Sequence, residues 1–578
     1  MLIIEYGDVE YAPGTFDPPT ATWGRGPITA SRWNVISQPI PVFKNMTAST
    51  YAGQVVGGSS AVNGMFFDRP ARGDLDAWDA AAGNRSMEKR ERWDWDSMYP
   101  FFKKSVTFHP PPAVVTQQFG YTWDASVYGS TTPIHSSFPP FLWADHYIVR
   151  DAWKGLNAST LQECAGGDKS GLCWIPVSQH PDTARRSHSG IGHYLEVNAT
   201  RSNYDLLVRH QVVRVLWPEE NPKSGPPIVE VRSRADNSVF NVTARAEVIL
   251  SAGVFNTPVI LQRSGIGKAS ILTQAGIKPI IDLPGVGSNL QDHSGAAVFW
   301  NYTKPLDSLR PLPTQLADPA FLADATAGFN ETPARGAYTL ANSNSAIFIP
   351  YLSLAGRNAT QDLIAKIHRS IQDGTAISTL PADYRDSPTL TAGYKRQLRT
   401  IANLINDPNT PSLESTFASG TNVRAINLHP LSRGTVRLNS THPLELPVVN
   451  YGSGSNPLDF DVYVHHVRYL RRMIATPAME RYGAVETLPG LAVQSDAELV
   501  EFVKDNINLS FMHPCCTAAM LPEEEGGVVG TDLRVHGAGR GLRVVDMSVL
   551  PFLPSSHLSA LAYAVGERAA AIVIRDWQ

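Results

Sequence analysis

A glycine-rich loop near the amino terminus constrains the fold of this chain more than any other feature. Residues 51–70 read YAGQVVGGSSAVNGMFFDRP, which joins a Gly-Gly-Ser-Ser run to an Asn-Gly-Met run. Glycine has no Cβ and tolerates positive φ, so backbone N–H groups in such a run can approach an anion closely. A plain glycine turn would explain an isolated Gly-Gly pair, but the length of this pattern favours a loop that cradles an anionic group.

The strand-like run at the start of the chain fits the same interpretation. Residues 2–4 are apolar and lead into Glu5. In a dinucleotide-binding βαβ unit, a glycine-rich turn follows the first strand, and an acid at the end of the second strand binds the ribose hydroxyls. We interpret LIIEYG as that second strand with Glu5 as the ribose acid, although a single Glu there is more often only a solvated strand end. Nothing before Met1 supplies the first strand and its G-x-G-x-x-G turn, so we expect the first βα unit to be missing from the chain as given.

Length and charge narrow the class of partner. The chain has 578 residues, of which 43% are apolar, so it can bury large cores. Its formal net charge of -4 and the lack of a Lys/Arg-rich run argue against nucleic acid and favour a small-molecule enzyme. No apolar run approaches the roughly 18 residues needed to cross a bilayer. The start of the chain is too short an apolar run for a signal peptide, and we expect no membrane partner.

Hydrophobic patterns divide the chain into three regions. Residues 1–290 alternate strand-like runs with Gly- and Pro-rich loops, which is typical of an α/β or α+β nucleotide-binding unit. Residues 291–424 are turn-rich and weakly periodic, and we interpret them as a substrate-side lobe; residues 425–578 return to strands and helices. Strand-like runs lie at 2–4, 203–217, 227–234, 245–253 and 426–440. Helical patterns lie at 359–372, 391–407, 459–475 and 557–577.

Glycosylation sequons indicate the compartment. The pattern N-x-[ST] occurs at Asn45, Asn84, Asn157, Asn198, Asn241, Asn301, Asn330, Asn358, Asn439 and Asn508. Coincidence would explain any one of them, but the set favours a secreted product or the secretory pathway for the full-length protein, although no signal peptide is present in the chain as given.

The four cysteines fall into two pairs. Cys164 and Cys173 could close a short loop by a disulfide, which agrees with a secreted protein. Cys515 and Cys516 are neighbours, and for them we expect a free, buried pair.

Five motifs, in the same order along the chain, resemble those of the glucose-methanol-choline (GMC) oxidoreductase family. They are spread over nearly the whole sequence, so chance is a negligible explanation. The motifs are GQVVGGSSAVNGMFFDRPARGDLDAWD at 53–79, SAGVFNTPVILQRSGIG at 251–267, DLPGVGSNLQDH at 282–293, LHPLSRGTVRL at 428–438, and the segment that begins HPCCTAAM at 513–570.

The resemblance implies the fold and the cofactor. It implies an FAD-binding Rossmann-like domain interleaved with an antiparallel-sheet substrate domain, in a chain of mixed α/β and α+β class. FAD would carry the hydride chemistry. Some members attach the flavin through a His in the first motif, where this chain has Val62 and Asn63, so non-covalent FAD is expected. The residues implied in cofactor binding are Gly57, Gly58, Ser59 and Ser60 at the pyrophosphate, Asn63, Gly64 and Met65 along the flavin, Val212 at the adenine through its backbone, and Asp546 as the acid of the C-terminal pattern, where Met547 replaces the usual alanine.

The resemblance also implies a catalytic pair, His513 and His557. Oxidation of an alcohol requires a base for the hydroxyl proton while hydride leaves the carbon for flavin N5, and imidazole has an ordinary pKa near working pH. A single histidine is more often a structural residue, but both of these match the positions of the family pair. We expect His513 to be the general base and His557 to orient substrate. One departure lies close by, because Cys516 stands before Thr517 where members usually have glycine.

The expected function is FAD-dependent oxidation of an alcohol group on a small organic molecule, with oxygen or a quinone as electron acceptor. The sequence resembles the fungal secreted and secondary-metabolite branch of the family, including aryl-alcohol oxidases and patulin synthase. Two alternatives stay open: a redox-neutral cyclase or dehydratase of the versicolorin B synthase type, and a truncated chain that is unable to bind FAD.

Overall fold

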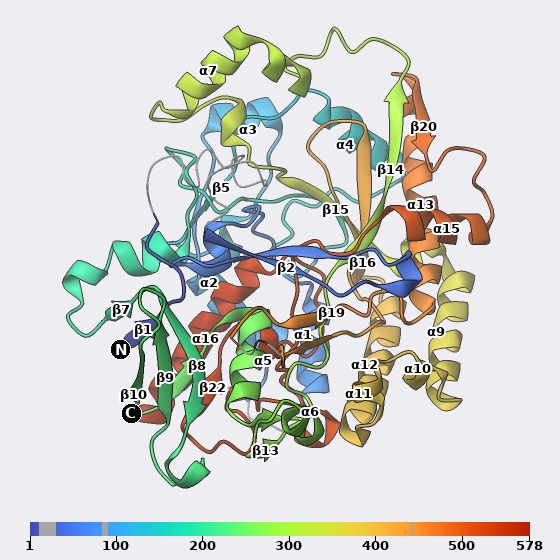
Figure 1. Ribbon diagram of the computed structural model, residues 1–578. Helices are drawn as coiled ribbons and strands as arrows, with labels where there is room; N and C mark the ends of the chain where they lie inside the picture. Colours follow the sequence, from blue (N-terminus) through green and yellow to red (C-terminus); the bar gives the residue numbers. More distant parts are fainter. Residues whose placement is uncertain (11–30, 84–90, 223, 441, 443) are drawn as a thin grey trace.

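The largest sheet of the protein draws strands from all three regions of the chain. The computed structural model describes residues 1–10, 31–83, 91–222, 224–440, 442 and 444–578 (Figure 1). The sheet has seven strands, all paired antiparallel, in the order β20-β14-β17-β16-β15-β6, with β21 also pairing with β14. They are β6 (Gly171–Trp174), β14 (Ser294–Tyr302), β15 (Ser345–Pro350), β16 (Pro411–Thr416), β17 (Asn422–Asn427), β20 (Ala484–Leu488) and β21 (Ile507–Asn508). The expected antiparallel-sheet domain is confirmed.

Amphipathic helices pack against this sheet and against each other. The helices α9 (Arg357–Gln372), α12 (Pro388–Asn406) and α13 (Leu458–Ile474) confirm three of the predicted helical patterns. In α13 the buried side chains follow a spacing of three or four residues, as in Phe460, Tyr463, Val467, Leu470 and Ile474. This stripe contacts β14 and β17 and forms part of the largest hydrophobic core.

Parallel strand pairs define the second part of the molecule. Strand β1 (Leu2–Ile4) runs parallel to β7 (Asp205–Leu207), and β11 (Val248–Leu250) runs parallel to β22 (Leu542–Val544). Within the part of the chain that the structure describes, no strand pairs with both of these sheets. A three-stranded antiparallel sheet, built from β8 (His210–Leu216), β9 (Ile228–Ser233) and β10 (Val239–Thr243), follows β7.

Two helices follow the strands of the parallel pair β11–β22 along the chain. Helix α5 (Gly253–Arg263) follows β11 after two residues. Helix α16 (Ser559–Trp577) confirms the fourth predicted helix and lies beside α2 (Trp95–Lys104), as Figure 1 shows. The ends of long helices expose backbone N–H groups with partial positive charge.

The region 291–424 holds more regular structure than its pattern predicts. Nearly every residue of β15 and β16 is buried, so the two-residue alternation of a half-exposed strand is absent there. Helix α7 (Pro319–Phe329) lies inside a segment that we expected to be turn-rich. Its proline occupies the first turn, and the Asp318 side chain accepts the Ala320 N–H at 2.9 Å, so the residues that suggested a turn form its cap.

Candidate active site

Two histidines from separate segments, His513 and His557, lie side by side. Their ring centroids are 4.5 Å apart and the ring planes are inclined at 77°. His513 lies in a segment whose Cys515 pairs antiparallel with Gln291, and His557 lies just before α16. His513 is only 9% exposed. The structure therefore brings together the two residues that the sequence assigned to catalysis.

A third histidine, His293, determines which nitrogen of His513 carries a proton. The Nδ1 atoms of the two rings are 2.9 Å apart, and Nε2 of His293 lies 3.1 Å from the carbonyl oxygen of Pro554. A carbonyl only accepts, so Nε2 of His293 holds a proton. Burial, helped by nearby His557, lowers the pKa of His293 to about 3 and keeps the ring neutral. Its Nδ1 is thus an acceptor, His513 donates from Nδ1, and Nε2 of His513 keeps its lone pair.

Asp292 holds the backbone of the same histidine. Its Oδ1 accepts the His513 N–H at 3.0 Å, and its Oδ2 accepts the Ser510 hydroxyl at 2.6 Å. Burial raises the pKa of Asp292 to about 7. Sequence reasoning gave Asp292 and His293 no role, although both stand at the end of the 282–293 motif, and that position was the signal that could have identified them.

Acidic side chains surround His557 on the side of its Nδ1. This nitrogen lies 3.1 Å from Oδ1 of Asp68 and 3.4 Å from Oε1 of Glu414. Asp68 also forms a buried ion pair with Lys169 at 2.5 Å, and Lys169 donates to the carbonyl oxygens of Arg69 and Ser555. Glu414 comes from β16, so the large sheet contributes directly to the site. Asp68, Lys169 and Glu414 were missed by sequence reasoning; only Asp68 lies in a motif that it quoted.

The environment drives the two histidines to opposite charge states. Burial, together with His557 and His293, lowers the pKa of His513 well below its ordinary value. Burial also opposes a charge on His557, but the carboxylates of Glu414 and Asp68 outweigh it and raise the pKa of His557. Burial tends to raise the pKa of Asp68, but Lys169 and His557 hold it down at about 2. A neutral His513 can accept a proton, and a cationic His557 beside it can stabilise the negative charge that remains on the substrate.

The glycine-rich loop forms a short 3-10 turn with one face closed and one open. Both Gly57 and Gly58 have positive φ, of 99° and 54°. A Cβ on Gly57 would lie 2.7 Å from the backbone nitrogen of Gly190, whereas a Cβ on Gly58 would have no atom of the described residues within 4 Å. The loop is also closed by its serines, because Ser59 Oγ accepts from Gly53 and Ser60 Oγ donates to the carbonyl of Gly57. The open face at Gly58 leaves room for a ligand.

Asn63 connects this loop to the start of α16. Its Oδ1 accepts from the Met65 N–H at 2.9 Å and from Nη1 of Arg186 at 2.8 Å, and its Nδ2 lies 3.3 Å from the hydroxyl of Ser559. Met65 is fully buried with φ of 67°. Gly64, between them, is half-buried. Asn63 therefore links the glycine-rich loop to the first turn of α16, which begins two residues after His557.

The carboxylate of Asp546 accepts hydrogen bonds from other residues of this chain. Its Oδ2 accepts from the Gly253 N–H and the Thr257 hydroxyl at the start of α5, and its Oδ1 accepts from Ser548. Gly253 has φ of 80°, and among the residues that the structure describes no atom would lie within 4 Å of a Cβ there. The carboxylate thus fixes the first turn of α5, and the open glycine beside it leaves space at the helix N-terminus.

Glu5 and Val212 lie apart from the histidines, beside a polar cleft. Glu5 Oε1 accepts the Gly7 N–H at 2.7 Å, and burial raises its pKa to about 7. Val212 is in β8, at a shift in its register with β9. The cleft has a volume of about 250 Å³ and is open to solvent, and its lining includes Tyr6, Gln211, Arg232, Arg234, Asn256 and Arg263. Tyr6 and Gln211 are the chain neighbours of Glu5 and Val212. The extended chain after Glu5 reaches the loop, where Asp8 pairs with Val55.

The cysteines form two disulfides. Cys164 and Cys173 are bonded, which confirms the predicted short loop. Cys515 and Cys516 are also bonded to each other, so the expected free pair is wrong. A backbone turn with φ of 80° at Cys516 accompanies the bond between these adjacent residues.

Comparison with known proteins gives consistent matches over the whole chain. Two family models, both described as GMC oxidoreductase, match residues 25–295 and 430–566. A dehydrogenase of Emericella nidulans, xptC, is 29% identical over 580 residues, which cover 99% of this chain and 88% of that protein. The GMC oxidoreductase family protein Mala s 12 of Malassezia sympodialis is 30% identical and covers 92% of this chain and 81% of its own length.

Two solved structures also match the fold over the whole chain. A fungal aryl-alcohol oxidase superposes with a TM-score of 0.96 at 55% identity, covering 100% of this chain and 94% of its own. An FAD-dependent oxidoreductase from Chaetomium thermophilum superposes with a TM-score of 0.90 at 32% identity, covering 100% of this chain and 95% of its own. The described helices include none long and apolar enough to span a membrane.

Proposed function

We propose that this chain, which belongs to the GMC oxidoreductase family, oxidises the alcohol group of a small aromatic molecule with His513 as the general base. Members of the family are flavoproteins, and the chain is accordingly an FAD-dependent oxidoreductase acting on alcohols. The observation that carries the proposal is the hydrogen bond between His293 and His513, at 2.9 Å. It leaves Nε2 of His513 as a base without a proton, in a buried site beside a cationic histidine.

Several residues take part in removing the hydroxyl proton, and each has a separate role. Nε2 of His513 accepts the proton, and the low pKa of its ring keeps this nitrogen available at neutral pH. His557, held as a cation by Glu414 and Asp68, stabilises the alkoxide that results. Asp292 and His293 keep His513 in place while the proton moves.

The site fits FAD at several independent points. Gly58 and Gly253 both have left-handed backbone, and no described residue fills the space where a Cβ would stand, which suits close approach of a cofactor. The arginines of the polar cleft would balance the charge of a pyrophosphate-linked adenosine near Glu5 and Val212. Val62 and Asn63 offer no histidine for a covalent bond, so FAD is held non-covalently. When bound, FAD would supply the hydride acceptor for oxidation of the carbinol carbon.

Aromatic side chains close to His557 support an aryl alcohol as the substrate class. The ring of Phe66 packs on His557 with centroids 4.5 Å apart. Phe66 belongs to a buried cluster with Phe348, and Phe511 packs against that cluster. Aromatic rings favour such surroundings through stacked and edge-on contacts. The likeness to a fungal aryl-alcohol oxidase at 55% identity points the same way.

A panel of benzylic, allylic and aliphatic alcohols, tested with oxygen and with a quinone, measures substrate class and electron acceptor together. We expect the benzylic alcohols to have the highest kcat/KM. Mixing the purified holoenzyme with a good substrate without oxygen should bleach the flavin. A flavin that stays oxidised while product forms would instead favour the redox-neutral cyclase.

The surface supports passage through the secretory pathway. Asn45, Asn157, Asn241, Asn301, Asn330, Asn358 and Asn508 are exposed sequon asparagines. Asn198 and Asn439 are half-buried, and Asn84 lies outside the described residues. Exposed acceptors agree with glycosylation in the secretory pathway.

A further inference from the structure

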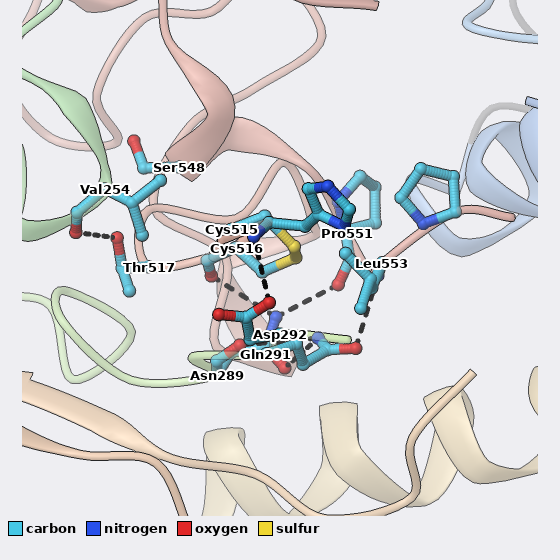
Figure 2. Close-up of a disulfide and its surroundings, with 12 residues drawn as sticks. Val254, Asn289, Gln291, Asp292, Cys515, Cys516, Thr517, Ser548, Pro551 and Leu553 are labelled. Carbon is cyan, nitrogen blue, oxygen red and sulfur yellow. Dashed lines mark hydrogen bonds between the residues drawn. A yellow bond between two sulfur atoms is a disulfide. The ribbon is translucent and has the colours of Figure 1, made fainter. Parts of the chain in front are cut away.

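The disulfide between Cys515 and Cys516 lies two residues beyond the proposed base. Both cysteines are completely buried. Figure 2 shows the bond in the turn above Asn289, Gln291 and Asp292. Nothing in the proposed chemistry uses the two sulfur atoms, although they stand in the segment that carries His513.

The backbone of this turn is fastened on both sides. The Cys515 N–H donates to the Gln291 carbonyl at 2.9 Å, and the Cys516 N–H donates to the Met547 carbonyl at 3.1 Å. The side-chain amide of Asn289 donates to the carbonyls of Cys516 and Pro551, at 3.4 and 3.0 Å (Figure 2). These hydrogen bonds therefore fix the backbone of Cys515 and Cys516, which follow His513 by two and three positions.

Cys516 has the conformation that glycine favours. Its φ is 80°, in the left-handed region where a Cβ collides with the backbone. Related family members usually have glycine at this position, as the HPCCT motif indicated. A cysteine there needs another source of restraint, and the bond to its neighbour supplies one.

We propose that the Cys515–Cys516 disulfide is a positioning element for His513: it holds residue 516 in the left-handed turn that glycine would otherwise adopt, and so aims the imidazole at His293. His513 meets three fixed partners, Asp292 at its N–H, His293 at Nδ1 and His557 at its ring. Met512, on its other side, also has positive φ, of 64°. Only Pro514 and Cys515 separate the base from the left-handed residue 516, and in the proposal a change of backbone at 516 reaches the ring through these two residues.

The inference rests on the proposed role of His513, and the first test does not depend on activity. The holoenzyme is unfolded in an alkylating reagent without reductant, digested and analysed by mass spectrometry. We expect the peptide with residues 515 and 516 to carry no alkyl group and to weigh two hydrogens less than the dithiol. A doubly alkylated peptide would overturn the proposal.

Two variants then separate the disulfide from the backbone conformation. Cys515→Ala leaves a cysteine without its bond at the left-handed position, and we expect kcat to fall at least about tenfold, within the roughly 10²-fold loss that a misplaced group produces. Cys515→Ala/Cys516→Gly should recover kcat to within about threefold of wild type, because glycine adopts positive φ without a collision. KM should change little in either variant, since both cysteines are completely buried.

The pH profile distinguishes positioning from general stability. In Cys515→Ala the acid limb of kcat/KM should move to higher pH, because a displaced His513 is less buried and its pKa returns toward the ordinary value. The double variant should restore the wild-type limb. An unaltered kcat and profile in Cys515→Ala, or a double variant as impaired as the single one, would contradict the inference. Failure of the His513 assignment itself would appear separately, as full turnover in His513→Ala.

Discussion

Nδ1 of His293 lies 2.9 Å from Nδ1 of His513, and the two residues are 220 positions apart in sequence. Because the other nitrogen of His293 faces a carbonyl, this one contact leaves a lone pair on the proposed base. His293 therefore selects the tautomer of His513.

Replacing His293 tests that selection. His293→Leu removes the acceptor for the His513 proton, and kcat should fall by at least about tenfold, toward the 10²–10⁴-fold that positioned acid–base groups contribute. His293→Asn keeps an acceptor oxygen near the position of Nδ1 and should retain more activity than the Leu variant. Steady-state kinetics on both proteins, with FAD content measured, decides the question. Equal activity in the two variants would argue against a role in the tautomer.

Glu414 should control the alkaline limb of the pH profile. The active form needs His557 as a cation, so kcat/KM is lost as pH rises through the raised pKa of His557. In Glu414→Gln that pKa falls, because its strongest favourable charge is gone, and the limb should move to lower pH. The acid limb, which reports protonation of His513 below its ordinary pKa, should stay in place. Glu480→Gln, at an exposed position, is the control. An alkaline limb that does not move would exclude this role for Glu414.

Alanine substitutions at two adjacent glycines should separate effects on cofactor binding from effects on folding. Alanine at either Gly57 or Gly58 incurs about 1–2 kcal/mol for left-handed backbone. Only Gly57→Ala adds a collision, with Gly190 at 2.7 Å, so its thermal midpoint should be the lower. Gly58→Ala places a methyl group in the space proposed for FAD and should lose flavin on gel filtration while it stays folded. Flavin retained at the wild-type ratio in Gly58→Ala would show that the open face is not the cofactor site.

Glycosylation should follow exposure. When the protein is produced through a fungal secretory pathway, the exposed sequons at Asn45, Asn241 and Asn330 should carry N-glycans. The half-buried Asn198 should be modified less or not at all. Peptide mapping before and after endoglycosidase treatment measures occupancy. Unmodified peptides at every exposed sequon would speak against secretion.

Local patterns predicted the parts of this protein whose contacts are local. The helices α9, α12, α13 and α16 were found because their apolar residues recur with helical spacing. The strands β15 and β16 were not, since burial on both faces removes the alternation that marks a strand.

The candidate site divides in the same way. His513 and His557 lie in a motif that can be matched in sequence, and the structure places them together. The partners that set their charge carry no signal in the sequence: Glu414 is the single acid of a buried strand, and Lys169 is far from both His557 and Asp68 in sequence although it pairs with Asp68. Such pairings arise from tertiary packing, which no spacing along the chain encodes. The bond between two adjacent cysteines was missed because a free pair is the ordinary arrangement.

The central claim is that His513 is the base, and single-turnover reduction of the flavin in His513→Ala tests it most directly. The variant should bind FAD as the wild type does and reduce it with a benzylic alcohol about 10²–10⁴-fold more slowly. His368→Ala, at an exposed position on α9, should reduce its flavin at the wild-type rate. Wild-type flavin reduction in His513→Ala, with FAD fully bound, would contradict the account.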